Sequence, residues 1–193
     1  MSCYQDIRSA ILHRRSIRKF QAKAVDPTIL KELIDLARFH ATGGNLQPLR
    51  FGLIASEDQR NAVFGLLKWA MYLPEFTVSP TEQPGGYIVI FSEKKESSPS
   101  FDIGAAATTI MLAAESYGLG SCCLGAFSAA KLAALLQLPE TLKPELVIAL
   151  GYPAHESNAV AFAGDVKYSM DENGNFSVPK RSLSEVLVYS DSQ

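Results

Sequence analysis

Residues 102–127 read DIGAAATTIMLAAESYGLGSCCLGAF and contain a helix, a glycine stop and a strand in sequence. Asp102 is a good helix cap, the following turns are apolar on nearly every side, and Gly118 can end the helix. The pattern predicts a helix over 102–117 that is buried in the core or in a subunit interface. Residues 121–124 then predict a short strand with glycines at its bends.

Strands are expected on both sides of this unit. Apolar runs at 51–55, 87–91 and 146–150 predict three more strands, and YIVIF at 87–91 is expected at the centre of the sheet because it is apolar on both faces. Asn173-Gly174, between two alternating segments, is a strong hairpin signal.

Helices are expected over 3–13, from the Asp26-Pro27 cap to Gly43-Gly44, after Ser56 and after Ser128. The apolar stripe of the second helix consists of Leu30, Leu33, Ile34, Ala37 and Ala41. The third helix is expected to continue through Val63, Leu66, Leu67 and Ala70. Helices and strands do not alternate strictly, which favours an α+β layered domain over a doubly wound sheet.

The bulk composition indicates one globular domain over 1–193. Its 193 residues suffice for one core, and the 18 basic and 20 acidic side chains exclude a nucleic-acid binder by charge. Three cysteines, two of them adjacent, argue against a disulfide framework and suit a reducing, cytoplasmic setting. Three scattered histidines predict no metal site, and no apolar run is long enough for a membrane span.

The stretch HRRSIRKF (13–20) concentrates positive charge in a chain whose formal net charge is −2. Arg14, Ser16 and Arg18 share one side if the backbone is extended. Two guanidinium groups around a hydroxyl would bind a phosphate or a carboxylate. The alternative is that these cations complement the C-terminal dipole of helix 3–13, and the stretch alone leaves both interpretations open.

Three other stretches favour a ligand. ATGGNLQPLRF (41–51) places Asn45 and Gln47 in a glycine-rich turn, GLGSCCLGAF (118–127) would let a flat ligand approach the backbone, and VPKRSL (178–183) adds two cations. Taken singly, they could equally be a polar loop, a buried strand and a solvated tail.

In their order and spacing, these segments resemble the nitroreductase-like family of FMN-dependent oxidoreductases over nearly the whole chain. The segments that carry the resemblance are RRSIRKF (14–20), ATGGNLQP (41–48), 102–127, ALGYP (149–153) and PKRSL (179–183). The resemblance implies a central mixed, largely antiparallel sheet covered by helices on both faces. It also implies an intertwined homodimer with FMN at the interface.

The resemblance further implies which residues contact FMN. Arg14, Arg15, Ser16 and Arg18 would hold its phosphate, ribityl chain and pyrimidine edge, with Arg18 stabilising the charge of the reduced ring. Lys180 or Arg181 would reach the phosphate. Asn45 and Gln47 would approach the ring from the partner subunit, and Gly125 and Ala126 would present backbone N–H groups near N5.

The implied chemistry belongs to the flavin and needs no catalytic side chain. NAD(P)H would pass hydride to N5 and leave, and a nitroaromatic, quinone or similar electron-poor acceptor would take its place in a ping-pong cycle. Gly43-Gly44 stands where the family often has Pro-Ser or Ser-Ser, and Leu49 stands where an aromatic is common. Both changes would enlarge the acceptor site.

Two segments are expected to complete the site. Residues 68–86 could form a pocket lid in which Trp69, Tyr72 and Phe76 line the acceptor site, although simple packing of a helix end would also explain them. A C-terminal tail over 165–193 is expected to contact the partner subunit. Alternatives to the reductase are a different flavin reaction such as dehalogenation or enoate reduction, a flavin-binding sensor without turnover, and a basic interaction module without cofactor.

Overall fold

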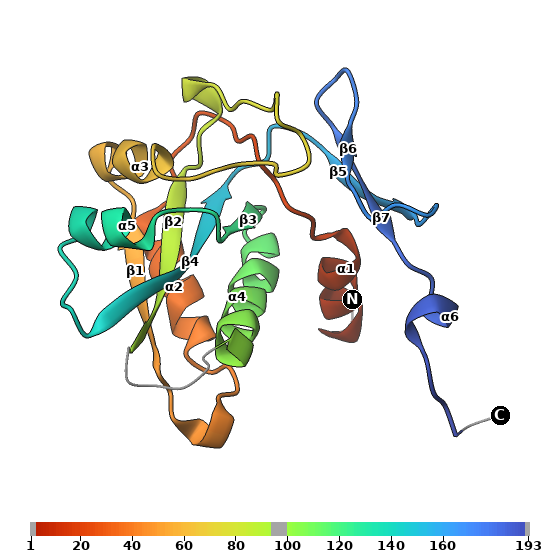
Figure 1. Cartoon of the computed structure of the whole chain (residues 1–193), viewed down its shortest axis with the longest axis horizontal. Helices are drawn as coiled ribbons and strands as arrows, with labels where there is room; N and C mark the ends of the chain where they lie inside the picture. Colours follow the sequence, from red (N-terminus) through yellow and green to blue (C-terminus); the bar gives the residue numbers. More distant parts are fainter. Residues whose placement is uncertain (1–2, 94–99, 192–193) are drawn as a thin grey trace.

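The computed structural model describes residues 3–93 and 100–191, and its centre is a four-stranded sheet (Figure 1). The strand order is β1 (Leu49–Ile54), β2 (Gly86–Glu93), β4 (Leu142–Gly151) and β3 (Gly120–Leu124). All three pairings are antiparallel. β2 contains the YIVIF run and lies inside the sheet between β1 and β4, which confirms that prediction.

Helices cover both faces of this sheet, as expected. On one face α2 (Pro27–Ala37) and α4 (Ser100–Glu115) pack in a single buried cluster with strand residues such as Ile88 and Ile148. On the other face α3 (Glu57–Phe64) and α5 (Ala129–Leu135) pack with the alternate strand residues. The α+β fold therefore follows from strands that are apolar on both sides.

The arginine-containing segment is extended beside β3. It follows α1 (Cys3–His13), and the backbone N–H of Ile17 donates to the carbonyl of Ser121 over 2.9 Å. Gly120 makes this approach possible, because a Cβ there would lie 2.6 Å from Cγ1 of Ile17. The segment is thus held in the conformation that places alternate side chains on one side.

A second, three-stranded sheet forms an arm that projects from the central sheet and leads to the C-terminus (Figure 1). Its order is β5 (Ser157–Ala161), β7 (Phe176–Lys180), β6 (Ser169–Met170), and the one-turn helix α6 (Leu183–Val186) follows. β5 and β7 pair in parallel, whereas the four strands of the central sheet pair only antiparallel with one another. The Asn173-Gly174 hairpin between β6 and β7 is confirmed, with Gly174 at φ 81°.

Two predicted helices end early. α2 stops at Ala37 instead of Gly43-Gly44, because the His40 ring meets the Ala37 carbonyl at 2.6 Å and the chain turns away; Ala41 is outside the helix. The glycines instead begin a 3₁₀ turn, η1 (Gly43–Asn45), with Gly44 at φ 56°. The long second helix was therefore a wrong prediction at its C-terminal end.

α3 stops at Phe64, and Ser56 precedes it without the predicted side-chain cap bond. Leu67, predicted to be helical, instead forms a bridge with Phe127. A tertiary contact with the segment after β3 replaces the local helical preference.

α4 is buried along one stripe only, formed by Ala106, Ala107, Ile110 and Ala114. Phe101 in its first turn is 89% exposed. Within one chain, α4 therefore does not have the burial on nearly every side that the sequence had predicted. Within the described residues, no helix combines the length and the apolar character that crossing a membrane requires.

Candidate functional site

Arg14, Ser16 and Arg18 come together at Cys122 in β3. Burial raises the pKa of the Cys122 thiol, and Arg18, Ser16 and Arg14 are all near enough to oppose that rise. Arg14 also directs a guanidinium N–H toward the Met111 sulfur at 3.8 Å. This common effect on one thiol fits the prediction that the three side chains share one side of an extended segment.

Arg18 is a buried cation, with 8% of its surface exposed. Its guanidinium lies 4.4 Å from the ring centre of Tyr168 and 4.9 Å from that of Phe176, and it reaches the Ser16 carbonyl over 3.4 Å. Among the described residues, no carboxylate forms an ion pair with it within 4.0 Å. Burying an unpaired charge is costly, so an anionic ligand at this place would remove a penalty.

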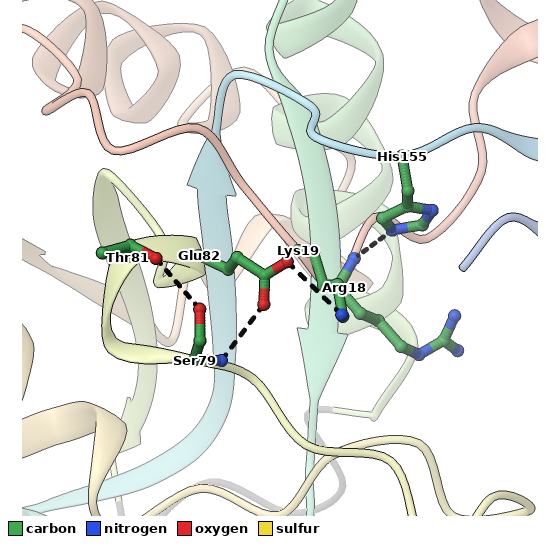
Figure 2. A network of polar contacts seen from close by, with 6 residues as sticks. All are labelled: Arg18, Lys19, Ser79, Thr81, Glu82 and His155. Carbon is green, nitrogen blue, oxygen red and sulfur yellow. Dashed lines mark hydrogen bonds and ion pairs between the residues drawn. The ribbon is translucent and has the colours of Figure 1, made fainter. Parts of the chain in front are cut away.

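The neighbouring cation differs from Arg18. Lys19 forms an ion pair with Glu82 over 3.3 Å, and Glu82 accepts a hydrogen bond from the Ser79 N–H over 3.2 Å (Figure 2). Glu82 ends the turn η2 (Pro80–Glu82), so this ion pair fastens segment 68–86 to the arginine-containing segment. Lys19 is thus neutralised inside the chain, while Arg18 is not.

His155 fixes the backbone of Arg18. The Arg18 N–H donates to Nε2 of His155 over 2.9 Å (Figure 2), and Nδ1 lies 2.9 Å from the Glu156 carbonyl. These contacts require the tautomer with its proton on Nδ1. Burial lowers the pKa of His155, and the charges of Arg18 and Lys19 lower it further, so the neutral ring is favoured.

Arg15 points away from this group. It lines a separate cavity of about 240 Å³ together with Glu115, His155 and other residues. Its Nε is buried without a hydrogen-bond partner, and burial followed by the charge of Arg14 lowers its pKa. The structure therefore does not bring Arg15 to the side of Arg14 and Arg18.

Gly125 and Ala126 form an exposed loop directly after β3. A Cβ at Gly125 would have no neighbour within 4 Å, so the backbone is open to a ligand. The Ala126 carbonyl accepts a hydrogen bond from the Lys68 N–H over 3.0 Å. This bond ties the loop to the first residue of segment 68–86.

The predicted pocket residues of segment 68–86 divide into two groups. Trp69 packs in the core cluster and stands 6.0 Å from the Phe64 ring, which fits the packing alternative. The Tyr72 ring is tilted by 56° against the Tyr168 ring at 5.1 Å, and Phe76 stands edge-on at 5.7 Å from Phe176. Tyr72 and Phe76 therefore join the aromatic cluster that surrounds Arg18.

The glycine-rich turn lies near the other end of α4. The Gly43 N–H donates to Asp102 in the first turn of α4 over 3.2 Å, whereas Arg14 contacts Met111. About 14 Å of helix axis separates those two contacts at 1.5 Å per residue. Gly43, Gly44, Asn45 and Gln47 are exposed and are not brought to Arg14 within one chain.

Leu49 is a core residue of the single chain. It is the first residue of β1, is 6% exposed and belongs to the core beneath α2 and α4. Within one chain the leucine fills core volume, and its effect on the size of the acceptor site stays a prediction.

Lys180 is the last residue of β7, and Arg181 follows it where the chain leaves the sheet of the arm toward α6 (Figure 1). The Arg181 guanidinium lies 4.3 Å from the ring centre of Phe162 and 3.9 Å from Glu185. The contacts of Arg181 are thus within the arm, and a role at the phosphate remains a prediction.

Sequence reasoning missed Tyr168, Phe176 and His155. All three belong to the C-terminal part of the chain but contact Arg18. The available signal was the pair Tyr168 and Phe176 within 165–177, a stretch that is mostly polar. It could not reveal a contact made across the fold.

Another cavity lies elsewhere. It measures about 1010 Å³ and is bordered by β1 and by the connection between α5 and β4, with Phe51, Ile54 and Leu138 among its lining residues. β1 and β3 are opposite edges of the central sheet, so this cavity is remote from the arginine-containing segment. No predicted site residue lines it. Over residues 3–93 and 100–191, no group of three or more His, Cys, Asp or Glu could hold a metal ion.

The sequence profile of the Nitroreductase family matches residues 11–79 and 70–152, which include the arginine-containing segment, both sheet faces and the loop after β3. The chain belongs to the Nitroreductase family. The match confirms the resemblance read from the motifs and makes an oxidoreductase the expected class.

Individual members agree with this assignment. A protein of Methanothermobacter thermautotrophicus named as an NADH dehydrogenase/NAD(P)H nitroreductase is 28% identical over 156 residues, covering 77% of this chain and 78% of its own. A nitroreductase structure from Desulfovibrio desulfuricans in complex with FMN is 25% identical, with a TM-score of 0.69 and 97% and 98% coverage. A Bacteroides thetaiotaomicron structure with 22% identity and the same TM-score and coverage supports the fold.

Proposed function

We propose that this nitroreductase-family chain is an FMN-dependent NAD(P)H oxidoreductase that reduces a nitroaromatic, quinone or similar electron-poor acceptor by ping-pong kinetics. The main support is the group formed by Arg14, Ser16 and Arg18. In it the buried Arg18 guanidinium has no carboxylate partner among the described residues. FMN brings an anionic phosphate and a ring that becomes negatively charged on reduction, so its chemistry fits this group.

The residues present divide the work of holding FMN. Arg14 would bind the phosphate, Ser16 would donate a hydrogen bond, and Arg18 would lie against the pyrimidine edge. The exposed loop at Gly125 and Ala126 would offer backbone N–H groups to the ring. Bound FMN supplies reversible hydride acceptance, and the protein supplies position, charge and exclusion of water.

We propose that a second copy completes the site. Asn45 and Gln47 are exposed at the opposite end of α4 from Arg14, which fits their contribution to the site of a partner. The tail over 165–193 contains exposed apolar residues, with Val188 95% and Tyr189 78% exposed. Covering such residues against a partner would stabilise a homodimer.

The first test is cofactor retention and reduction. The purified chain is mixed with FMN, freed of excess, and its visible spectrum is recorded anaerobically before and after NADPH or NADH. Bound flavin that bleaches supports the proposal and identifies the preferred nicotinamide. Bound flavin that does not bleach favours a sensor, and absence of bound flavin overturns the cofactor assignment.

A charge reversal tests the assignment of the phosphate site. Arg14→Glu should weaken FMN binding by about tenfold or more, because a charge-assisted hydrogen bond is lost and a repulsion is added. Lys143→Glu is the matched control, since Lys143 is exposed and pairs with Glu145 on β4. A folded Arg14→Glu protein that binds FMN like the control would contradict the assignment.

A further inference from the structure

Arg18 is held by two rings that come from the C-terminal arm. Tyr168 and Phe176 place their ring centres 4.4 and 4.9 Å from the guanidinium carbon. The two rings are 5.9 Å apart and tilted by 52°, so they form two walls around one cation. Figure 2 shows the Arg18 side chain extending away from the Lys19–Glu82 pair.

We infer that Tyr168 is a positioning residue for the flavin reaction: its ring holds the Arg18 guanidinium where it stabilises the reduced ring, and its hydroxyl joins that cation to the acceptor segment 68–86. This inference rests on the proposed function, because it assigns Arg18 to bound FMN. Phe176 supplies the second wall and belongs to the core of the arm, with 1% of its surface exposed.

The rings are the main restraint on the guanidinium. The Arg18 side chain reaches the Ser16 carbonyl at 3.4 Å, a long hydrogen bond, and no carboxylate of the described residues pairs with it. An arginine has many rotamers, so weak polar contacts alone would leave it mobile. A desolvated cation against an aromatic face gains considerably more than an exposed one.

The arm contains an informative contrast. Arg181 also lies over a ring, that of Phe162, but it has the carboxylate of Glu185 at 3.9 Å and is exposed. The charge of Arg181 therefore already has a counter-charge within the chain. The arrangement at Arg18 has rings and burial without a counter-charge, which is what a cation reserved for an anionic ligand requires.

Tyr168 also contacts the segment expected to border the acceptor. The Tyr72 N–H donates to the Tyr168 hydroxyl over 3.4 Å, and the two rings are 5.1 Å apart. The ring face of Tyr168 therefore contacts Arg18, and its hydroxyl contacts segment 68–86. The C-terminal arm thereby connects the two parts of the site.

The test separates the ring from the hydroxyl. Tyr168→Leu removes both, and Tyr168→Phe keeps the ring. The measurement is the two-electron midpoint potential of FMN-saturated protein, with the melting temperature recorded for each variant. Tyr152→Leu is the matched control, because the Lys23 ammonium lies 3.8 Å from the centre of the Tyr152 ring, outside this cluster.

Tyr168→Leu should lower the equilibrium constant for flavin reduction by about tenfold, a shift of about −30 mV, because the guanidinium is no longer held in place. Tyr168→Phe and Tyr152→Leu should keep the wild-type potential. Tyr168→Phe should instead raise KM for the acceptor with kcat nearly unchanged, because the contact with Tyr72 is weakened.

Arg18→Gln separates failure of the inference from failure of the proposed function. If Arg18→Gln lowers the potential but Tyr168→Leu does not, the positioning role is wrong and the FMN site stands. A higher potential in Tyr168→Leu also overturns the inference, since the rings would then keep the cation away from the flavin. If Arg18→Gln has no effect on potential or FMN affinity, the site assignment itself fails.

Discussion

The contact between Gly120 and Ile17 controls how closely the arginine-containing segment approaches β3. A Cβ added at Gly120 would lie 2.6 Å from Cγ1 and 2.8 Å from Cβ of Ile17, both well inside van der Waals contact. The Ile17 Cβ is fixed to the backbone and cannot rotate away. Gly120→Ala must therefore displace the segment, and with it the flanking residues Ser16 and Arg18.

Overpacking of this kind costs about 1 to 3 kcal/mol, and Ile17 is buried in the core with 8% exposed. For a domain of this size, each kcal/mol lowers the melting temperature by about 2 to 4 °C. Gly120→Ala should therefore melt about 2 to 12 °C below wild type. Its affinity for FMN should fall as well, because the 2.9 Å bond from Ile17 N–H to Ser121 is stretched. Calorimetry and FMN fluorescence quenching measure the two effects.

Gly52→Ala is the steric control. Its added Cβ would lie 2.8 Å from the Phe91 ring, but Gly52 is on β1 at the opposite edge of the sheet. It should lower the melting temperature without changing FMN affinity at a temperature where both variants are folded. Equal FMN affinity in Gly120→Ala and wild type would refute the argument that this glycine positions the arginines.

Two further outcomes follow from buried titratable groups. Burial and the charge of Arg18 lower the pKa of His155 from 6.5, so the unfolded chain takes up the proton first as the pH drops. The free energy of unfolding should therefore fall as the pH drops through about 6.5. His155→Gln should flatten that pH dependence in a series of urea-unfolding experiments, and an unchanged slope would contradict the assignment. Burial raises the pKa of Cys123 to about 12 and also raises that of Cys122, so in a Cys3→Ser background a thiol reagent at pH 8 should react slowly before unfolding and rapidly after it.

The parts of the fold that the sequence predicted are those set by local pattern and burial. The YIVIF run is apolar on both faces and forms the inner strand β2, and Asp26 caps α2 by accepting the Thr28 N–H over 2.8 Å. The alternation of Arg14, Ser16 and Arg18 was also predictable, because it needs only an extended backbone. Each of these features depends on residues close together in the chain.

The failures have a common physical origin in contacts between distant segments. Leu67 leaves the predicted helix because it pairs with Phe127. Tyr168 reaches Arg18 from the far end of the sequence. Such contacts leave no period in the sequence, so pattern reasoning had no means of finding them.

The positions of the predicted site residues along α4 fit the proposed homodimer. The glycine-rich turn contacts the first turn of α4, and the arginine-containing segment contacts its second half. Near the turn, Phe101, Phe39 and Leu46 are exposed by 89%, 71% and 67%.

Exposed apolar residues beside a turn that was expected to meet a ligand need a common explanation. In the proposed homodimer, a partner would cover them and bring Asn45 and Gln47 to the arginines of the other chain. Binding of FMN and association would then be linked, because each bound cofactor would contact both copies. Dilution should accordingly weaken FMN retention, and excess FMN should shift the association equilibrium toward the dimer. Sedimentation velocity with and without FMN would measure this linkage, and a dissociation constant independent of FMN would contradict a shared site.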